Sequence, residues 1–471
     1  MFFDNSQNGL KKRVHFIGIG GIGMSGLAMI LNKIGCTVSG SDLTNNDNIA
    51  TLEKLGVKSF IGHQYQNIDE ATDLVIKTSI VKDNNPEIIS AKEKNITIIR
   101  RADLLAMMMK EKIGVTVAGT HGKTSTTAMT ALLFETAGFD PLVINGGIIN
   151  YYGSNAKFGL GKYLVAESDE SDASFVDLPT FIGVVTNIEP EHLEFYGGNF
   201  DLVKSHFKRY ITQIPQDGLA VLCIDDIEVK KIYDQIKNSH NIISCGLETS
   251  ADISASNISF DVDGIKFDAN IKKSAQIITD IKVPIYGIHN VKNALAIVAI
   301  ASFLSIDDNI LKKALSSYSG VKRRFTKTGE VGGITIIDDY AHHPTEIKAT
   351  IKAARDLLGK EKKLITVFQP HKYSRVRDLF NEFCEAFNDT NIVIVADIYS
   401  AGQEEIEGIN QDALISGITK AGHKNVIKLK DKNELPILIK DLAKTGDMVL
   451  CVGAGNITAW AKELPNLLKS I

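Results

Sequence analysis

The segment IGVTVAGTHGKTSTTAMTALLFETAG, residues 113–138, decides the fold class of this chain. An apolar run suited to a buried strand leads into the turn AGTHGKT (118–124), and a helical pattern follows. In such a turn, backbone N–H groups surround phosphate oxygens, the Lys123 ammonium reaches the β- and γ-phosphates, and the Thr124 hydroxyl holds Mg²⁺. The general phosphate-binding loop has glycine where this chain has Val117. The segment therefore predicts a short variant of a nucleotide-binding loop, and not an ordinary kinase or GTPase.

A second glycine-rich turn, GIGGIG (18–23), joins a predicted strand at 14–20 to a predicted helix at 21–34. Its glycines allow backbone N–H groups to approach a diphosphate at the helix N-terminus. Asp42 ends the next predicted strand, at 36–42, where a carboxylate that binds ribose belongs. By itself the motif fits a nicotinamide or flavin dinucleotide, any other diphosphate nucleotide, or a tight packing turn that binds nothing.

Three separate starts of alternating strand and helix divide the chain of 471 residues. Alternation of this kind predicts α/β folds with mainly parallel sheets. We expect a first domain at 1–108, a central domain at 109–320 and a C-terminal domain at 321–471. Between 241 and 284, alternating polar and apolar residues predict antiparallel strands with a turn at Asp263-Gly264. Further strands are predicted at 71–79, 96–100, 163–168, 181–187, 334–344, 363–371, 392–398 and 447–455, and a helix at 290–304.

Composition excludes several broad classes of protein. The formal net charge of −4 gives no general attraction to nucleic acid or anionic membranes. The five cysteines are scattered without a CxxC pair, which argues against a zinc site or a disulfide framework and for reduced, mostly buried thiols. The N-terminal sequence MFFDNSQNGLKKRV lacks a signal-peptide pattern, and no uncharged apolar run reaches the roughly 18 residues that span a bilayer. We therefore expect a cytoplasmic protein with no membrane insertion and no nucleic-acid partner.

Polar side chains gather where predicted strands end. The acidic loop AESDESD (166–172) follows one strand, and the group IEPEHLEF (188–195) follows the next. Carboxylates there could face the nucleotide loop and bind Mg²⁺, which prefers hard oxygen ligands, or they could form solvated loops. The candidates are Glu167, Asp169, Glu170, Asp172, Glu189, Glu191 and His192.

Four later segments contain the other candidate residues. In GIHNVKN (287–293) the asparagines could read a purine or ribose, or the first of them could simply cap a helix. KRRF (322–325) is either a charged linker or a source of cations for phosphoryl charge. DDYAHHPTE (338–346) and FQPHKYSR (368–375) concentrate ionisable groups at strand ends, which is unusual for surface loops.

Together these motifs resemble the Mur ligase family of peptidoglycan synthesis, and the HHP segment resembles its alanine-adding branch. The motifs HFIGIGGIGMSGLA, GTHGKTSTT, AESDESDASF, TNIEPEHLE, GIHNVKNALA, GVKRRF, DDYAHHPTE and FQPHKYSR occur in that family's order, from Val14 to about Ala459. The resemblance implies three domains: a Rossmann-like domain for the UDP part of UDP-N-acetylmuramate, a P-loop-type central ATPase domain, and a Rossmann-like C-terminal domain for the amino acid. It also implies that ATP and Mg²⁺ are the cofactors, and that the lactyl carboxylate is phosphorylated and then joined to L-alanine.

The resemblance implies roles for individual residues as well. For ATP they are Gly119, Thr120, His121, Gly122, Lys123, Thr124, Ser125, His289, Asn290, Asn293 and Asp339. For the UDP-sugar they are Gly18, Gly20, Gly21, Gly23, Met24, Ser25 and Asp42, and for the amino acid Tyr340, His342, His371 and Arg375. Catalysis is expected from Lys123, His192, Arg323 and Arg324, with Thr124, Glu167 and His192 as Mg²⁺ ligands. Lys123 and Glu167 are expected to serve the chemical step rather than the fold.

Three alternative functions stay open on the sequence. A murein tripeptide-recycling ligase of the same family shares the HHP segment. A dinucleotide oxidoreductase would explain the turn at 18–23 but leaves the second loop unused. A regulatory nucleotide-binding switch would explain Lys123 but not the HHP cluster. We expect a monomer or a weak homodimer.

Overall fold

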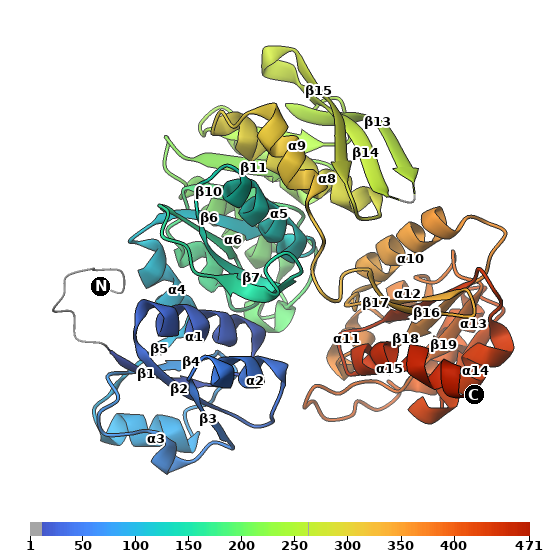
Figure 1. Ribbon diagram of the computed structural model, residues 1–471, viewed down its shortest axis with the longest axis horizontal. Coiled ribbons are helices and arrows are strands. Elements are labelled where there is room, and N and C mark those ends of the chain that lie inside the picture. The colour runs from blue at the N-terminus through green and yellow to red at the C-terminus, as the bar shows by residue number, and fades with distance from the viewer. Residues whose placement is uncertain (1–11, 262) are drawn as a thin grey trace. The chain divides into compact units, whose positions relative to one another are not determined.

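The computed structural model describes residues 12–261 and 263–471. Residues 1–11, where the sequence shows no signal-peptide pattern, lie outside this part of the chain. Two compact units are present: one of Met1–Asn257, Phe267–Ile281 and Lys292–Ser319, the other of Ile258–Lys266, Lys282–Val291 and Gly320–Ile471. Three separate sheets with helices between their strands confirm the predicted α/β class (Figure 1).

The N-terminal sheet has five parallel strands in the order β3-β2-β1-β4-β5. The strands are β1 (Arg13–Ile17), β2 (Thr37–Asp42), β3 (Lys58–Ile61), β4 (Leu74–Lys77) and β5 (Thr97–Arg100), and the helices α1 (Ile22–Ile34), α2 (Asp47–Lys54), α3 (Pro86–Glu93) and α4 (Arg101–Met109). Along β1, Phe16 shares a core with α1 while Ile17 shares one with α3. The predicted strand at 14–20 ends at Ile17, because the chain turns at Gly18, whose φ of +85° favours glycine.

The central sheet has ten strands in the order β15-β14-β13-β12-β11-β10-β6-β9-β7-β8. The strands are β6 (Ile113–Ala118), β7 (Leu142–Ile149), β8 (Ser154–Lys157), β9 (Tyr163–Glu167), β10 (Ile182–Val185), β11 (Leu219–Cys223), β12 (Ile242–Gly246), β13 (Ile253–Asp261), β14 (Gly264–Ile271) and β15 (Gln276–Val283). The helices are α5 (Lys123–Thr136), α6 (Phe200–Thr212), α7 (Ile227–Ile236), α8 (Ile288–Phe303) and α9 (Asp308–Ser316).

The prediction of antiparallel strands from residue 241 onward is wrong for β12, which pairs in parallel with both β11 and β13. The second half of β12 is buried on both faces, which is typical of an interior parallel strand and not of an alternating one. Further along, β13 ends at Asp261 and β14 begins at Gly264. The predicted turn at Asp263-Gly264 is therefore confirmed.

Strand β7 was not predicted, because Gly146 and Gly147 interrupt its apolar sequence. It pairs in parallel with β9 and antiparallel with β8. A Cβ at position 146 would displace the Glu167 carboxylate of β9, so glycine allows this carboxylate to approach the backbone of β7. The Gly146 N–H donates to Glu167 Oε2 at 2.9 Å. A glycine pair that looks like a turn in the sequence is thus a close approach between neighbouring strands.

Helix α1 packs against β7 and β8, so the N-terminal and central sheets share a hydrophobic core. Leu27 of α1 and Ile144 of β7 belong to this core. Gly26 makes the approach possible, because a Cβ there would lie 2.9 Å from Asn155 Nδ2, which donates to the Ile22 carbonyl. Both glycine-rich turns predicted to bind nucleotides therefore lie in one compact unit, while the residue boundaries of the predicted domains stay predictions.

The third sheet belongs to the second unit and has the order β16-β17-β21-β18-β19-β20. Its strands are β16 (Thr326–Val331), β17 (Ile334–Asp339), β18 (Leu364–Phe368), β19 (Ile392–Val395), β20 (Val426–Lys428) and β21 (Met448–Val452), and its helices α10 (Pro344–Leu358), α11 (Tyr373–Asp378), α12 (Phe380–Cys384), α13 (Gln411–Lys420), α14 (Leu435–Leu442) and α15 (Ile457–Ser470). Along β21, Leu450 packs in the core beneath α10 and Cys451 in the core beneath α15. These two helices cover opposite faces of the sheet (Figure 1).

Two expectations from composition can be compared with the structure. In the described part of the chain, no helix is both long and apolar enough to cross a membrane. The five cysteines are thiols, and four of them are buried while Cys36 is half-buried, as predicted.

The centre of β2 is a strict glycine position. A Cβ at Gly40 would lie 2.7 Å from the Phe16 carbonyl oxygen and 2.7 Å from Ile19 Cβ, and neither atom can move without shifting the sheet. We expect Gly40→Ala to lower the free energy of unfolding by about 1–3 kcal/mol, measured by urea denaturation. The control is Gly23→Ala, whose Cβ would meet only the flexible Arg101 side chain and which should be neutral or stabilising. A Gly40→Ala variant as stable as the unmodified chain would contradict this packing.

Candidate active site

The turn AGTHGKT joins β6 to α5, as predicted. The φ angles of +132° at Gly119 and +82° at Gly122 lie in the left-handed region that favours glycine. The backbone N–H of Thr120 donates to the Asn187 carbonyl (3.1 Å), and that of His121 donates to Asn187 Oδ1 (2.8 Å). The segment after β10 therefore holds the turn in its conformation.

Lys123 is the first residue of α5, and 13% of its side chain is exposed. Its Nζ donates to the carbonyls of Gly119 (2.6 Å) and Thr120 (3.1 Å) and forms an ion pair with Glu170 at 2.8 Å. Burial would lower the pKa of Lys123, but the attraction of Glu170, and then of Glu167, outweighs burial and raises this pKa above its usual value. Burial raises the pKa of Glu170 to about 7, against the attraction of Lys123. The lysine thus stays charged while its partner titrates near neutral pH.

Glu167, the predicted Mg²⁺ ligand, ends β9 but does not pair with Lys123. Its carboxylate accepts the Gly146 N–H instead, and it acts on Lys123 only through its charge. The carboxylate that contacts the lysine is Glu170, three residues later and beyond the end of the strand. The sequence identified both residues as candidate Mg²⁺ ligands, and the resemblance favoured Glu167 for that role.

A second group of ligand-type atoms lies at the same edge of the central sheet. One oxygen or nitrogen from each of Glu170, Glu191 and His192 lies within 4.8 Å of the others. Two carboxylates beside an imidazole fit a divalent cation that prefers oxygen ligands, such as Mg²⁺. His192 has a φ of +56°, a conformation that is rare outside glycine and that functional sites often retain. The structure thus supports His192 as a candidate ligand and adds Glu170 and Glu191, while the buried Thr124 stays a predicted ligand.

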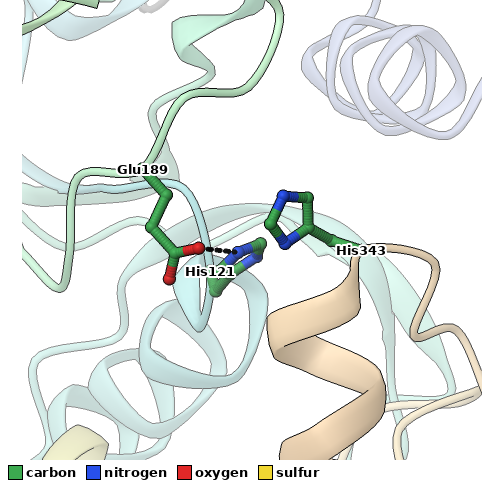
Figure 2. Close-up of side chains that lie close together, drawn as sticks. All are labelled: His121, Glu189 and His343. Atoms are coloured by element: carbon green, nitrogen blue, oxygen red, sulfur yellow. Dashed lines mark ion pairs between the residues drawn. The ribbon is translucent and has the colours of Figure 1, made fainter. Parts of the chain in front are cut away.

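The side chain of His121 projects from the nucleotide turn toward Glu189, and the two form an ion pair at 3.6 Å (Figure 2). Glu189 also donates its backbone N–H to Thr120 Oγ1 at 2.8 Å. His343, also labelled in Figure 2, belongs to the second unit and is the N-cap residue of α10. The Asp172 side chain, a further acidic candidate, lies outside the described residues.

The asparagines of GIHNVKN both lie in α8. This helix begins at Ile288, so Asn290 sits inside its first turn, and the reading of Asn290 as N-cap is wrong. Its Nδ2 donates to the Tyr286 carbonyl at 2.7 Å and lies 3.0 Å from His289 Nε2. Asn293 reaches the nucleotide turn, since a Cβ at Gly122 would lie 2.9 Å from Asn293 Oδ1. The adenine and ribose roles predicted for these residues stay predictions.

The first glycine turn is held from β2 and the segment after it. Asp42 Oδ2 accepts the Gly20 N–H at 2.9 Å, and Asn48 Nδ2 donates to the Gly20 carbonyl at 2.8 Å. The carboxylate predicted to bind ribose therefore also fixes the loop. Gly21 is the N-cap of α1, which places Gly23, Met24 and Ser25 in its first turns.

In the second unit, the guanidinium groups of Arg323 and Arg324 both lie over the aromatic ring of Tyr340. Their guanidinium carbons are 4.5 and 5.4 Å from the centroid of Tyr340. Arg323 Nη2 also donates to the Gly453 carbonyl at 3.0 Å, and burial lowers the pKa of this arginine. Arg324 forms an ion pair with Glu346 at 3.5 Å. Both cations are thus packed beside a residue predicted to bind the amino acid.

The predicted amino-acid residues form one contiguous group. The His342 ring lies 5.1 Å from that of Tyr340 and 6.0 Å from that of His371. His371 stacks on Tyr399, which the sequence did not identify, with centroids 5.6 Å apart and planes at 9°. Arg375 Nη1 lies 3.2 Å from His371 Nδ1. Burial, and then the charge of Arg375, lower the pKa of His371 to about 3, so its imidazole is neutral at physiological pH.

Asp339 ends β17 and is 5% exposed. Its carboxylate accepts the N–H groups of Phe325 (2.7 Å) and Ala341 (2.8 Å) and lies 3.3 Å from Thr350 Oγ1. Burial raises the pKa of Asp339 to about 6, although Arg324 opposes this. The carboxylate predicted to contact ADP therefore holds together the two turns that present Arg323 and Tyr340.

Lys123 forms a buried ion pair with Glu170, so its loss should also affect stability, while its expected service to the chemical step stays a prediction. Lys123→Ala leaves Glu170 buried without its cation, which typically costs about 3–5 kcal/mol when the carboxylate is ionised. The folded-state pKa of Glu170 already lies above its unfolded value, so the stability due to this group falls as pH rises through about 7. We expect the loss of stability in Lys123→Ala to be large at pH 8 and small at pH 5.5, measured by urea denaturation at both values.

The matched control is the double variant Lys123→Ala/Glu170→Gln, which removes the buried charge as well. It should recover most of the stability lost at pH 8 and show little dependence on pH between 5.5 and 8. A loss of stability in Lys123→Ala that is the same at both pH values would show that Glu170 is not the group involved.

Three family models match this chain in order. They are described as the Mur ligase family, catalytic domain (residues 13–113), the Mur ligase middle domain (117–301) and the Mur ligase, glutamate ligase domain (323–455). Two relatives from Rhodospirillum rubrum and Bradyrhizobium sp. (strain BTAi1), both named UDP-N-acetylmuramate–L-alanine ligase, are 46% identical over 462 residues. The alignments cover 97% of this chain and 95% and 98% of those proteins.

Solved structures agree with this three-domain architecture. The crystal structure of UDP-N-acetylmuramate–alanine ligase from Thermotoga maritima matches with a TM-score of 0.83 and 29% identity, over 97% of this chain and 99% of that chain. A murein peptide ligase from Psychrobacter arcticus shares the fold, with a TM-score of 0.70 and 22% identity over 98% of this chain and 99% of that chain. The order of the motifs, the two nucleotide turns and the full-length similarity lead to one conclusion: this chain belongs to the Mur ligase family.

Proposed function

We propose that this chain joins L-alanine to the lactyl carboxylate of UDP-N-acetylmuramate, with ATP converted to ADP and phosphate, in the cytoplasmic synthesis of peptidoglycan precursors. The observation that carries this proposal is the 46% identity, over 97% of the chain, to relatives named for this reaction. The geometry agrees with it, because both glycine turns lie in one compact unit and the predicted amino-acid residues form one group in the other.

The reaction proceeds in two steps. An oxygen of the lactyl carboxylate attacks the γ-phosphorus of ATP, the bond to the β-phosphate oxygen breaks, and ADP leaves. The amine of L-alanine then attacks the acyl carbon, loses a proton, and phosphate leaves. The first step needs little proton transfer, so positioning and charge neutralisation dominate it.

Lys123 supplies a permanent cation for this first step. Its charge is secured by Glu170, and it stands at the N-terminus of α5, where the helix dipole also favours phosphate. Glu170, Glu191 and His192 would hold Mg²⁺, with Thr124 and Glu167 as further predicted ligands. Bound there, Mg²⁺ would neutralise phosphate charge.

The amino acid is proposed to bind at Tyr340, His342, His371 and Arg375. Since His371 is neutral, Arg375 is the cation of this group that can take the carboxylate of alanine as a bidentate pair. Tyr340 and His342 would then line the methyl pocket. Loss of a methyl contact is worth only about 1–3 kcal/mol, so glycine should be a poor substrate and not an inert one.

The function is tested by incubating the protein with ATP, Mg²⁺, UDP-N-acetylmuramate and L-alanine and measuring released phosphate. Phosphate should appear only when all four are present, with ADP in equal amount. A parallel reaction contains the murein tripeptide in place of alanine. Faster ligation of the tripeptide would assign the chain to the recycling ligases, and NADP-dependent absorbance changes would point to an oxidoreductase.

The amino-acid pocket is tested by Arg375→Lys, which keeps the charge but cannot form the bidentate pair. We expect the KM for L-alanine to rise about 10-fold or more, while the KM values for ATP and UDP-N-acetylmuramate stay nearly unchanged. The matched control is Arg377→Lys on the same helix, since Arg377 is exposed and forms an ion pair with its neighbour Asp378. An unchanged alanine KM in Arg375→Lys would place the carboxylate of alanine elsewhere.

A further inference from the structure

One cation stands between the two glycine turns and has no role in the site described above. Arg101 is the first residue of α4, directly after β5 of the N-terminal sheet. The turn at 18–23 follows β1 of the same sheet, and the carboxyl ends of parallel strands meet at one edge. Arg101 therefore lies at the edge where the first glycine turn presents its backbone N–H groups.

The contact of Arg101 with the glycine turn is close. A Cβ built on Gly23 would lie 3.3 Å from both Cδ and Nη1 of Arg101. Gly23 thus leaves room for the arginine side chain beside the first turn of α1. The third glycine of a G-x-G-x-x-G motif usually allows close packing of helix and strand. Here the glycine leaves space for the Arg101 guanidinium next to the N-terminus of α1. The guanidinium charge and the helix dipole would both attract an anion there.

The other end of the guanidinium faces the central sheet. Its Nη2 lies 3.6 Å from Asp169 Oδ2, and Asp169 directly precedes Glu170, the partner of Lys123. Within the first compact unit, Gly23, Arg101, Asp169, Glu170 and Lys123 therefore follow one another from the first glycine turn to the second. The Arg101–Asp169 pair joins the carboxyl edges of two sheets that are predicted to bind two different substrates.

The pair is too loose to be explained by stability alone. At 3.6 Å, with 21% of the arginine and 42% of the aspartate side chain exposed, such a contact is worth little. Among the described residues, no hydrogen bond shorter than this distance satisfies the guanidinium. An arginine held by one weak carboxylate contact keeps N–H donors for a second oxyanion.

We propose that Arg101 binds the diphosphate of the sugar nucleotide, and that Asp169 is a positioning residue that holds the guanidinium between the two glycine turns. This inference rests on the proposed function and adds a cation to a site that is otherwise made of backbone N–H groups. The diphosphate is favoured over the lactyl carboxylate because the arginine contacts Gly23, at the end of the turn where a diphosphate meets the helix.

The test is isothermal titration calorimetry of the full chain with three ligands. UDP-N-acetylmuramate contains the diphosphate and the lactyl carboxylate, UDP-N-acetylglucosamine contains the same diphosphate without that carboxylate, and ATP is the control ligand. We expect Arg101→Ala to lower the affinity for both UDP-sugars about 10- to 100-fold and to leave the affinity for ATP unchanged. Arg101→Lys should recover part of the affinity, since charge remains while the planar fork is lost.

The matched control is Arg100→Ala, which removes the same charge one residue earlier. Arg100 is exposed and pairs with Asp103 at 2.7 Å, so its loss should not change UDP-sugar affinity. In steady-state assays, Arg101→Ala should raise the KM for UDP-N-acetylmuramate with little change in kcat, because a diphosphate contact is the same in the ground and transition states. A lower melting temperature with unchanged affinity would instead mark Arg101–Asp169 as a structural pair.

The outcomes separate this inference from the proposed function. If the unmodified chain does not bind UDP-N-acetylmuramate, the proposed function fails. Should the unmodified chain bind it and Arg101→Ala bind it equally well, only the role of Arg101 is overturned. Loss of affinity confined to UDP-N-acetylmuramate would place Arg101 on the carboxylate and overturn the diphosphate assignment.

Discussion

The buried ion pair between Lys123 and Glu170 is the interaction on which the first compact unit depends. It joins the start of α5, which follows β6, to the segment after β9. Strands β6 and β9 are neighbours in the central sheet. Burial opposes the charge of both groups, so each needs the other, and the lysine completes its coordination with carbonyls of its own turn. The ion pair that links these two segments thereby also keeps a cation at the N-terminus of α5, where phosphate is expected.

Glycine determines how closely the surrounding elements approach this pair. Gly119 and Gly122 adopt backbone angles that other residues avoid, Gly146 receives the Glu167 carboxylate, and Gly23 leaves room for Arg101. At each of these positions, a polar group from another segment of the chain occupies the space that a side chain would need. The strand ends of the N-terminal and central sheets can therefore come together with Arg101 and Asp169 still paired.

In the second unit a different buried carboxylate has the organising role. Asp339 accepts the backbone N–H groups of Phe325, two residues after Arg323, and of Ala341, directly after Tyr340. Its neighbours Arg323 and Arg324 stack on Tyr340, and the adjoining His371 stays neutral because burial and Arg375 disfavour its protonation. The positive charge of this group is thus concentrated on arginines, which suits the binding of carboxylate and phosphate groups and does not suit proton transfer.

The sequence alone determined the features that are local in the chain. Strand, glycine turn and helix follow one another within a few residues, so their order predicted the α/β class and both glycine turns. The grouping of Tyr340, His342, His371 and Arg375 came from the resemblance to the Mur ligase family. Only the tertiary structure decided which groups meet across elements. It paired Lys123 with Glu170, showed that Gly146 and Gly147 lie within strand β7, placed Asn290 inside α8, and brought Arg101 to Gly23 and Asp169. The reason is physical: local backbone preference depends on neighbours in sequence, whereas ion pairing and close packing depend on the register and curvature of strands that are distant in the chain.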